Sequence, residues 1–466
     1  MERPASAPPN RRGEADALFP LPLTPFERFL LVSDGPEYPM TCWVVADFQG
    51  EFEPSRLEGA LEEALERHPM LRTRMADHRR WAPPDPVEEA LSVTWEPWTH
   101  EAPPLSPEPL DVGGGEGLRF RVQQGQGRSR WVVEFHHALV DGMGFTHFLR
   151  DVAALYERSG DGGAAPTLAP LNPHLLRRRG TPGPSGSGDP PETSGTLLTG
   201  GGRNVARFLL RRPHLLRREI GGEGGETAPD FEGHTLDPEE SARLRSTADR
   251  LQVSLNDLLL CALFRSLARW NAPTDPFRSS RWIRVLVPVN LRTRKDLRMP
   301  AANRVGLAFV DRRHRECANP TALVQGIAQE MREVRRRNLG WLFTQAVALV
   351  DRVPGLLRLL SQASTGRVTA VFSNGGELLR GRHVSHMRSG EGIATPWLQR
   401  VCASPPLRRG TRVGFMVNRC REELTITLYP DRRHLGEEAS QLLLAIFVQS
   451  LEEVAALAPE REIAAS

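Results

Sequence analysis

Residues 131–144 read Trp131-Val-Val-Glu-Phe-His136-His137-Ala-Leu-Val-Asp141-Gly142-Met-Gly144. The apolar run that opens this stretch is typical of a strand, and the two glycines favour a sharp turn. Apolar residues then recur at helical spacing, which predicts a helix from about Gly144 to Tyr156. The stretch therefore predicts a strand, a turn and a helix in succession, with two histidines at the strand end.

The histidine pair and the aspartate after it are candidate catalytic residues. Side chains alternate across a strand, so His136 and His137 should face opposite ways, one into a cleft and one beneath it. Histidine titrates near neutrality and is the commonest general base. Asp141 could order the turn or orient a ring, and Gly142 lets the backbone turn. We expect His137 to act as the base, supported by His136, Asp141 and Gly142.

Two other interpretations of the pair stand beside this one. Two histidines at a strand end can be purely structural, but the Asp-Gly that follows at a set distance favours the functional interpretation. Two histidines and an aspartate could also ligate zinc. Adjacent side chains diverge on a strand, however, and no cysteine lies nearby in the sequence. We therefore expect no metal site.

Similar patterns recur on both sides of this stretch. We expect strands at residues 41–48, 118–122, 130–136, 282–289, 304–310, 368–372, 412–417 and 423–429. We expect helices from Pro54 to about His68 and at residues 255–270, 320–338, 341–361 and 437–456. Because strands and helices interleave in both halves, the expected fold is α/β (α+β), with two lobes built on mixed sheets.

Changes in composition divide the chain. Residues 1–17 are polar and rich in proline, as in a disordered lead, and residues 18–157 form the expected N-terminal lobe. Residues 158–230 contain much Gly, Pro, Ser and Arg, which predicts a flexible linker. Within it, residues 204–218 are basic and amphipathic, which fits either a solvated helix or weak docking on an anionic membrane. Residues 231–466 form the expected C-terminal lobe.

Bulk properties exclude several classes of function. The net charge of +3 gives no support to a nucleic-acid partner. Lys295 is the sole lysine and follows Arg294, so the chain has no P-loop. The five cysteines are far apart and form no Cys-x-x-Cys pair, which fits reduced thiols in the cytoplasm. No stretch approaches the ~20 apolar residues that span a bilayer. We expect a cytoplasmic protein, with peripheral membrane contact left open.

The pattern His-His-x-x-x-Asp-Gly resembles the signature of an acyltransferase superfamily. This superfamily contains peptide-synthetase condensation domains and bacterial wax ester synthase/diacylglycerol acyltransferases. Residues 60–72 are similar to the family's first helix and its Arg-His-Pro-x-Leu-Arg ending. The resemblance to the wax ester group extends to four further stretches: residues 254–260, 287–292, 303–306 and 373–375. The chain departs from that group at two of them. Ala302 stands where the group has a glycine before the third stretch, and the prolines that the group has after the Ser-Asn pair are missing after Ser373-Asn374.

The resemblance implies two lobes, each like chloramphenicol acetyltransferase, with a tunnel between them. An acyl thioester of coenzyme A or of a carrier-protein phosphopantetheine would meet an alcohol or amine acceptor at His137. No cofactor would be bound, and no Gly-x-Ser-x-Gly nucleophile elbow occurs in the chain. The family's aspartate pairs with a distant arginine, which points to Asp141 and Arg292. Candidate tunnel residues are Asn256, Asp257, Asn303, Ser373 and Asn374. The alternative role is helix capping for the first two and a plain turn for the last two.

Three functions remain open on the sequence. The first is an acyltransferase that uses His137 as general base for direct attack. The second is an amide-forming, condensation-domain-like enzyme of a peptide or polyketide pathway. The third is a non-catalytic scaffold that keeps the fold. The intact His137 and Asp141 favour an enzyme, because a binding protein has no physical need of a base at that turn.

Overall fold

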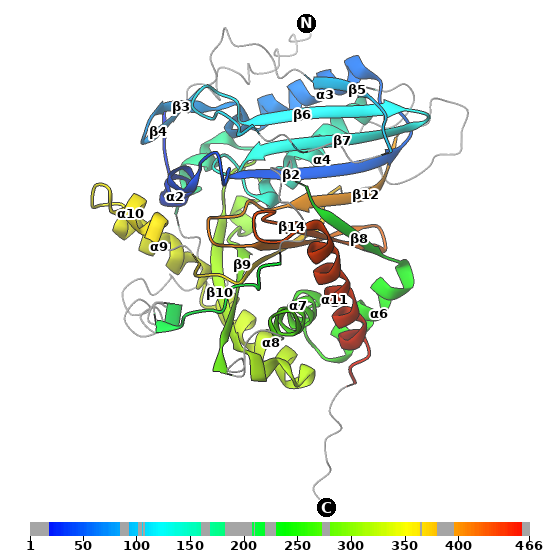
Figure 1. Cartoon of the computed structure of the whole chain (residues 1–466). Helices are drawn as coiled ribbons and strands as arrows, with labels where there is room; N and C mark the ends of the chain where they lie inside the picture. The colour runs from blue at the N-terminus through cyan, green and yellow to red at the C-terminus, as the bar shows by residue number, and fades with distance from the viewer. Residues whose placement is uncertain are drawn as a thin grey trace, which may run out of the picture.

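The computed structural model describes residues 18–83, 93–100, 105, 108–159, 168–181, 207–208, 210–219, 230–272, 280–363, 366–379 and 396–458. Within these residues, two lobes of sheet and helix lie one above the other (Figure 1). The predicted disordered lead, residues 1–17, lies outside the described residues.

A five-stranded sheet in the order β12-β2-β7-β6-β5 forms the N-terminal lobe. β5 and β6 run parallel, whereas the other neighbours are antiparallel. A hairpin joins β6 to β7 through Gln126 and Gly127, both with positive φ. The strands are β2 (Thr41–Gln49), β5 (Val93–Pro97), β6 (Leu118–Gly125), β7 (Arg128–His136) and β12 (Trp397–Ser404).

Two helices, α3 (Pro54–Arg67) and α4 (Gly142–Arg158), pack against this sheet and against each other. α3 begins at a proline, which lacks the N–H that a first helical turn leaves unbonded anyway. The side chains that recur every four residues along α3, Leu57, Leu61 and Leu65, are all buried. Both helices were predicted from this periodicity, and both are confirmed.

The C-terminal lobe contains a six-stranded sheet in the order β10-β9-β11-β13-β14-β8. β11 runs parallel to both of its neighbours, whereas the other pairs are antiparallel. The prediction of mixed sheets in two lobes is therefore confirmed. The strands are β8 (Glu232–Leu236), β9 (Trp282–Asn290), β10 (Val305–Arg313), β11 (Ala370–Glu377), β13 (Val413–Cys420) and β14 (Glu423–Pro430).

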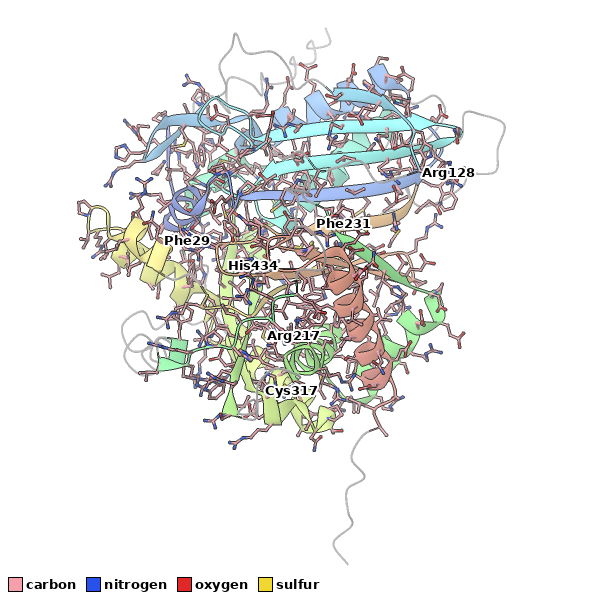
Figure 2. The ribbon with its side chains drawn as sticks, in the orientation of Figure 1. Phe29, Arg128, Arg217, Phe231, Cys317 and His434 are labelled. Atoms are coloured by element: carbon pink, nitrogen blue, oxygen red, sulfur yellow. The ribbon has the colours of Figure 1, made fainter. Side chains whose placement is uncertain are left out.

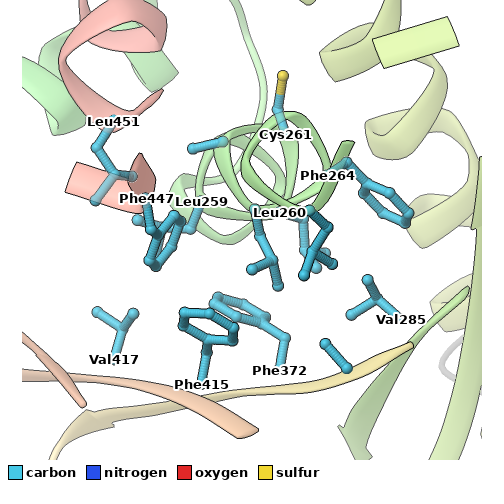
Figure 3. Packing of buried hydrophobic residues seen from close by; sticks show 14 of the residues in the cluster. Leu259, Leu260, Cys261, Phe264, Val285, Phe372, Phe415, Val417, Phe447 and Leu451 are labelled. Atoms are coloured by element: carbon cyan, nitrogen blue, oxygen red, sulfur yellow. The ribbon is translucent and has the colours of Figure 1, made fainter. Parts of the chain in front are cut away.

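Helix α7 is the centre of this lobe. It is apolar around most of its circumference, and helices lie beside it while the sheet lies beneath it. Figure 3 shows Leu260 of α7 above Phe372 and Phe415 of the sheet, with Phe447 of α11 alongside. The helices are α6 (Pro238–Arg250), α7 (Leu255–Asn271), α8 (Pro320–Arg336) and α11 (Glu437–Ala455), with short 3₁₀ turns at Pro69–Arg72, Pro173–Arg178, Arg294–Asp296 and His314–Cys317.

Three helices flank the junction of the lobes: α2 (Pro25–Ser33), α9 (Gly340–Val350) and α10 (Leu356–Ala363). α2 packs on both α9 and α10, and its Phe29 is labelled in Figure 2. A small sheet of β1 (Leu21–Pro22), β4 (Arg80–Ala82) and β3 (Arg74–Asp77) adjoins α2. The prediction of one helix over 341–361 is wrong, because Pro354 lacks a backbone donor and Gly355 takes a φ of +78°.

The predicted boundaries need two corrections. β12 belongs to the C-terminal range by sequence, yet it pairs antiparallel with β2, so the boundary at 231 does not separate the sheets. Residues 168–181 were predicted to be flexible linker, but they pack into the fold. Leu176 is buried there, and the buried Arg179 donates to Glu27 at 2.7 Å. These contacts hold this part of the predicted linker against the N-terminal lobe.

The predicted basic helix at 204–218 also requires correction. Residues 207, 208 and 210 are helical, but residues 211–219 are irregular, with bridges from Pro213 to Trp282 and from Glu219 to Leu435. Proline disfavours a helix at this point, and the bridges hold the segment along the C-terminal lobe. Over the residues with described positions, no single helix has the length and apolarity to cross a membrane; α6 and α7 reach them only jointly, across a 106° bend.

Candidate active site

The histidine pair lies where β7 leaves its sheet. His136 is the last residue of β7 and pairs with Thr41 of β2. The backbone N–H of His137 still donates to the Met40 carbonyl oxygen at 2.7 Å. α4 then begins at Gly142, so the predicted strand, turn and helix are confirmed.

His136 is buried beneath the turn. Its Nδ1 accepts the Ala138 N–H at 3.1 Å, so its Nε2 carries the hydrogen. This Nε2 lies 3.5 Å from a carboxylate oxygen of Asp34. Burial acts to raise the pKa of Asp34, but contact with His136 and the Met40 N–H lowers it below its usual value. The position predicted for His136, packed under the turn, is the one observed.

His137 is half-buried and faces a cavity. Its Nδ1 lies 3.2 Å from the Val140 carbonyl oxygen, which can only accept a hydrogen bond. Nδ1 therefore carries the hydrogen, and Nε2 keeps a free lone pair. Burial lowers the pKa of His137 below its usual 6.5, although the charge of Asp141 and backbone hydrogen bonds oppose that shift. The ring is accordingly neutral at pH 7, with Nε2 in the form that accepts a proton.

Asp141 joins the two lobes at this turn. One of its oxygens caps α4 by accepting the Gly144 N–H at 2.7 Å. The other accepts from Arg292 Nη1 at 2.9 Å and from the backbone N–H of Arg304 at 2.6 Å. Burial acts to raise the pKa of Asp141, but Arg292 and the two N–H groups hold it below its usual value. The expected pair with Arg292 is therefore present, and so is the helix cap.

Arg292 holds Asp141 with one nitrogen only. Its other terminal nitrogen, Nη2, donates to the Ala302 carbonyl oxygen at 2.7 Å. Arg292 thus binds both the turn and the segment that precedes β10.

That segment supports the turn from below. The Asn303 amide donates to the carbonyl oxygens of His137 and Ala138, each at 2.8 Å. A Cβ on Gly144 would lie 2.8 Å from the Ala302 oxygen, so the close approach requires glycine there. Gly142, the predicted supporting glycine, has open space at the corresponding position. The steric demand therefore falls on Gly144.

Sequence reasoning missed two residues of this site. Arg304 directly follows Asn303, and its guanidinium donates to Asp296 at 2.9 Å and to the carbonyl oxygens of residues 178 and 181. It therefore fixes the segment that bears Asn303. Asp34 binds His136 from a loop with no distinctive pattern. Arg304 could have been identified as a charged residue at the start of an apolar strand. No feature of the sequence points to Asp34.

A cavity of about 930 Å³ opens from His137. Its walls come from α2, β9, β10, α8, α9 and α10 and from the loop between β12 and β13. Most lining side chains near α2 and α9 are apolar, and Phe26 lies edge-on to the His137 ring at 6.2 Å between centroids. Further apolar side chains of the wall include Phe29, Met40, Leu286, Pro288, Leu307, Ala308, Phe343, Val347 and Leu357.

The predicted tunnel residues do not line this cavity. Asp257 forms a capping box with Ser254 at the start of α7, as the structural alternative predicted, and Asn256 stands beside it. Ser373 and Asn374 belong to β11, where a bulge follows Asn374. Asn303 lies under the turn rather than in the cavity. A tunnel open at both ends remains a prediction.

The chain's five cysteines are free and buried. Burial raises the pKa of the Cys261 and Cys317 thiols to about 12 and that of Cys420 to about 11. It also raises the pKa values of Cys42 and Cys402. These thiols stay protonated at neutral pH, so they are poor nucleophiles. Among the residues that the structure describes, no group of three His, Cys, Asp or Glu side chains could hold a metal.

Over part of its length, the chain is similar in sequence to known proteins. The Condensation domain family model matches residues 37–171, which include the His137 turn. Two uncharacterized proteins of Mycobacterium tuberculosis strains are 26% identical over 279 residues, covering 56% of this chain and 60% of each relative. The match thus spans less than two thirds of the length of these curated relatives.

Solved structures share the fold. The first condensation domain of the calcium-dependent antibiotic synthetase, in complex with a substrate analogue, has a TM-score of 0.65 at 16% identity, with 94% of this chain and 96% of that chain covered. Polyketide synthase associated protein 5 from Mycobacterium tuberculosis has a TM-score of 0.59 at 15% identity, covering 94% and 98%.

An epimerization domain of tyrocidine synthetase B also superimposes, with a TM-score of 0.63 at 14% identity and coverage of 94% and 97%. Because one fold thus carries more than one reaction, function must be argued from the site. The chain resembles condensation domains in fold over its two lobes, and it matches their family model in sequence over residues 37–171.

Proposed function

We propose that the chain is an acyltransferase that moves an acyl group from a thioester to an alcohol or amine, with His137 as general base. One observation carries the proposal: a neutral histidine with a fixed ring presents Nε2 at a large, mostly apolar cavity. General bases require this combination of a free lone pair, a pKa near or below the working pH, and room for substrate.

The chemistry follows from the tautomer. The acceptor's O–H or N–H would donate to Nε2 of His137 and lose its proton to it while the oxygen or nitrogen attacks the thioester carbonyl carbon. The carbon–sulfur bond then breaks, and the leaving thiolate takes the proton from the His137 imidazolium. Asp141 and Asn303 would act through position alone, since both bind the turn rather than the imidazole ring.

Direct attack needs no covalent intermediate on the protein. The five cysteines are protonated at neutral pH for the reasons given above. The acyl group would therefore stay on the donor until the acceptor attacks, and His137 would carry out both proton transfers.

The cavity supports a substrate with a long apolar portion. A volume of about 930 Å³ exceeds what a small acyl group such as acetyl fills. This agrees with the resemblance to wax ester enzymes, which handle lipids. The donor thioester is carried by coenzyme A or by a carrier protein; the carrier is favoured by the synthetase condensation domain that shares the fold. A cytoplasmic location and peripheral membrane contact remain predictions.

Mass spectrometry provides the direct test. Purified protein is incubated with acyl-coenzyme A or acyl-phosphopantetheinyl carrier protein and a set of alcohols and amines. We expect an ester or amide with at least one donor class, and no acyl adduct in the intact-protein spectrum during turnover. A lasting adduct would contradict direct attack. Absence of product with every combination, from protein of normal stability, would favour the non-catalytic scaffold.

Chain-length selection should change when the cavity is partly filled. Leu307 is half-buried on β10 and lines the cavity opposite Pro288 of β9, so Leu307→Trp should occupy the space of a long chain. We expect kcat/KM for a long-chain substrate to fall about ten-fold more than for an acetyl substrate. Retained turnover of the acetyl substrate controls for misfolding. An equal loss for both substrates would show that this cavity does not hold the chain.

A further inference from the structure

We infer that Arg408 anchors an anionic group, carboxylate or phosphate, on the substrate whose apolar portion fills the cavity. This inference deepens the proposed function, and it rests on that function in treating the bound ligand as a substrate. Arg408 lies in the loop between β12 and β13, where the chain returns from the N-terminal sheet to the C-terminal sheet, and it lines the cavity.

The guanidinium of Arg408 is fixed in place. Its Cζ lies 4.4 Å from the centroid of the Phe29 ring, in a cation–π contact. Its Nη2 donates to the Ser361 hydroxyl oxygen at 2.9 Å and to the Ser361 carbonyl oxygen at 3.3 Å. The Ser361 hydroxyl is in turn 2.9 Å from that of Ser33. The loop, α10 and α2 thus orient one cation at the cavity wall.

This cation lacks a counter-ion in the part of the chain that the structure describes. Its Nε is buried without a hydrogen-bond partner, and no described carboxylate lies at ion-pair distance. Burial lowers the pKa of Arg408 to about 10, yet the group is still charged at pH 7. An unpaired charge in an apolar setting is unfavourable, and a bound anion would relieve that cost.

The fully buried arginines of the fold are paired, unlike Arg408. Arg284, also on the cavity wall, holds both oxygens of Asp311 at 2.7 and 2.9 Å. Arg179 is paired with Glu27, at 2.7 Å. Arg408 is half-buried, but its Nε is fully buried, and the guanidinium has no such carboxylate partner among the described residues. Arginine recognises carboxylates and phosphates especially well, which names the chemical class of the missing partner.

The anchor and the proposed base belong to one continuous wall. Ring centroids of His137 and Phe26 are 6.2 Å apart, those of Phe26 and Phe29 are 6.2 Å apart, and Arg408 lies over Phe29. A ligand whose reacting group is at His137 and whose anion is at Arg408 would run along these two phenyl rings. The substrate class is therefore an amphiphile with an apolar segment between its reacting and anionic groups.

Calorimetric titration with three ten-carbon probes tests this without turnover: decanoate, decyl phosphate and decanol. We expect the better of the two anions to bind wild-type protein about ten-fold tighter than decanol, the gain typical of a hydrogen bond to a charged group. The ratio of decanoate to decyl phosphate affinity distinguishes a carboxylate from a phosphate ligand.

Matched variants locate the effect. Arg408→Gln should abolish the preference for anions, and Arg408→Lys should retain part of it. Arg358→Gln removes an exposed arginine of α10 that does not line the cavity, and it should leave the preference intact. Thermal unfolding confirms that each variant is folded. If wild type binds decanol as tightly as both anions, or if Arg408→Gln keeps the preference, the inference is overturned.

The outcome is separable from that of the proposed function. His137→Ala should keep the preference for anions, because it removes the base and not the anchor. An anion preference without any acyl transfer would support the anchor and count against the proposed reaction. Acyl transfer by a protein without anion preference would support the proposed reaction and count against the anchor.

Discussion

Replacing His137 with alanine is expected to slow acyl transfer by ~10²–10⁴-fold, the usual contribution of a general base. The protein should remain folded, because the ring is half-buried and borders a cavity rather than filling the core. Its one side-chain hydrogen bond goes to the Val140 carbonyl oxygen. The measurement is kcat/KM with the donor and acceptor found by mass spectrometry, together with the midpoint of thermal unfolding.

His136→Ala is the matched control. His136 is buried, accepts the Ala138 N–H and faces Asp34, so its loss should lower the unfolding midpoint. A loss of rate in His137→Ala and a loss of stability in His136→Ala would identify His137 as the base and His136 as a structural residue. Full activity of the His137→Ala variant would exclude the proposed mechanism.

The pH profile gives a second readout of the same residue. Only neutral His137 can accept a proton, and burial lowers its pKa below 6.5. The rate should therefore be constant near pH 7–8 and should fall as pH drops through this lowered pKa. In His137→Ala the residual rate should lose this acidic limb. A wild-type limb centred well above pH 6.5 would contradict the neutral, desolvated ring.

Local sequence pattern accounts for most of the fold that surrounds the site. The apolar periods of α3, α4, α7 and α11 and the strand β7 predicted their elements, because each buries one regular face or run. β12 was missed, since its character depends on pairing with β2. Arg400 of β12 bonds Asp47 of β2 across 353 positions of sequence, and nothing in the local pattern records such a partner.

The candidate site divides in a similar way. The turn residues His137 and Asp141 could be identified because their chemistry is unusual at a strand end. The cavity wall could not, because apolar side chains such as Phe26 and Phe343 look like core residues in sequence. Asn303 was placed by resemblance in a tunnel, yet its amide binds backbone carbonyls. Resemblance located the position correctly, but the contacts decide the role.

The pair of Asp141 and Arg292 should show strong energetic coupling. Both side chains are largely buried, and they join α4 of the N-terminal lobe to the end of β9 in the C-terminal lobe. Removing one partner leaves a buried charge without compensation, which costs about 3–5 kcal/mol of unfolding free energy. Asp141→Asn and Arg292→Ala should each lose stability on this scale. The double variant should be damaged less than the sum of the singles.

Activity should follow the geometry of the turn rather than proton transfer by Asp141. Asp141 bonds the Gly144 and Arg304 N–H groups, so its loss frees the backbone that carries His137. We expect kcat to fall more than KM rises, with the acidic limb of the pH profile retained. Combining Asp141→Asn with Arg284→Ala, which breaks a buried pair elsewhere, should give additive losses of stability. Additive losses for Asp141 and Arg292 themselves would show that the contact does not hold the turn.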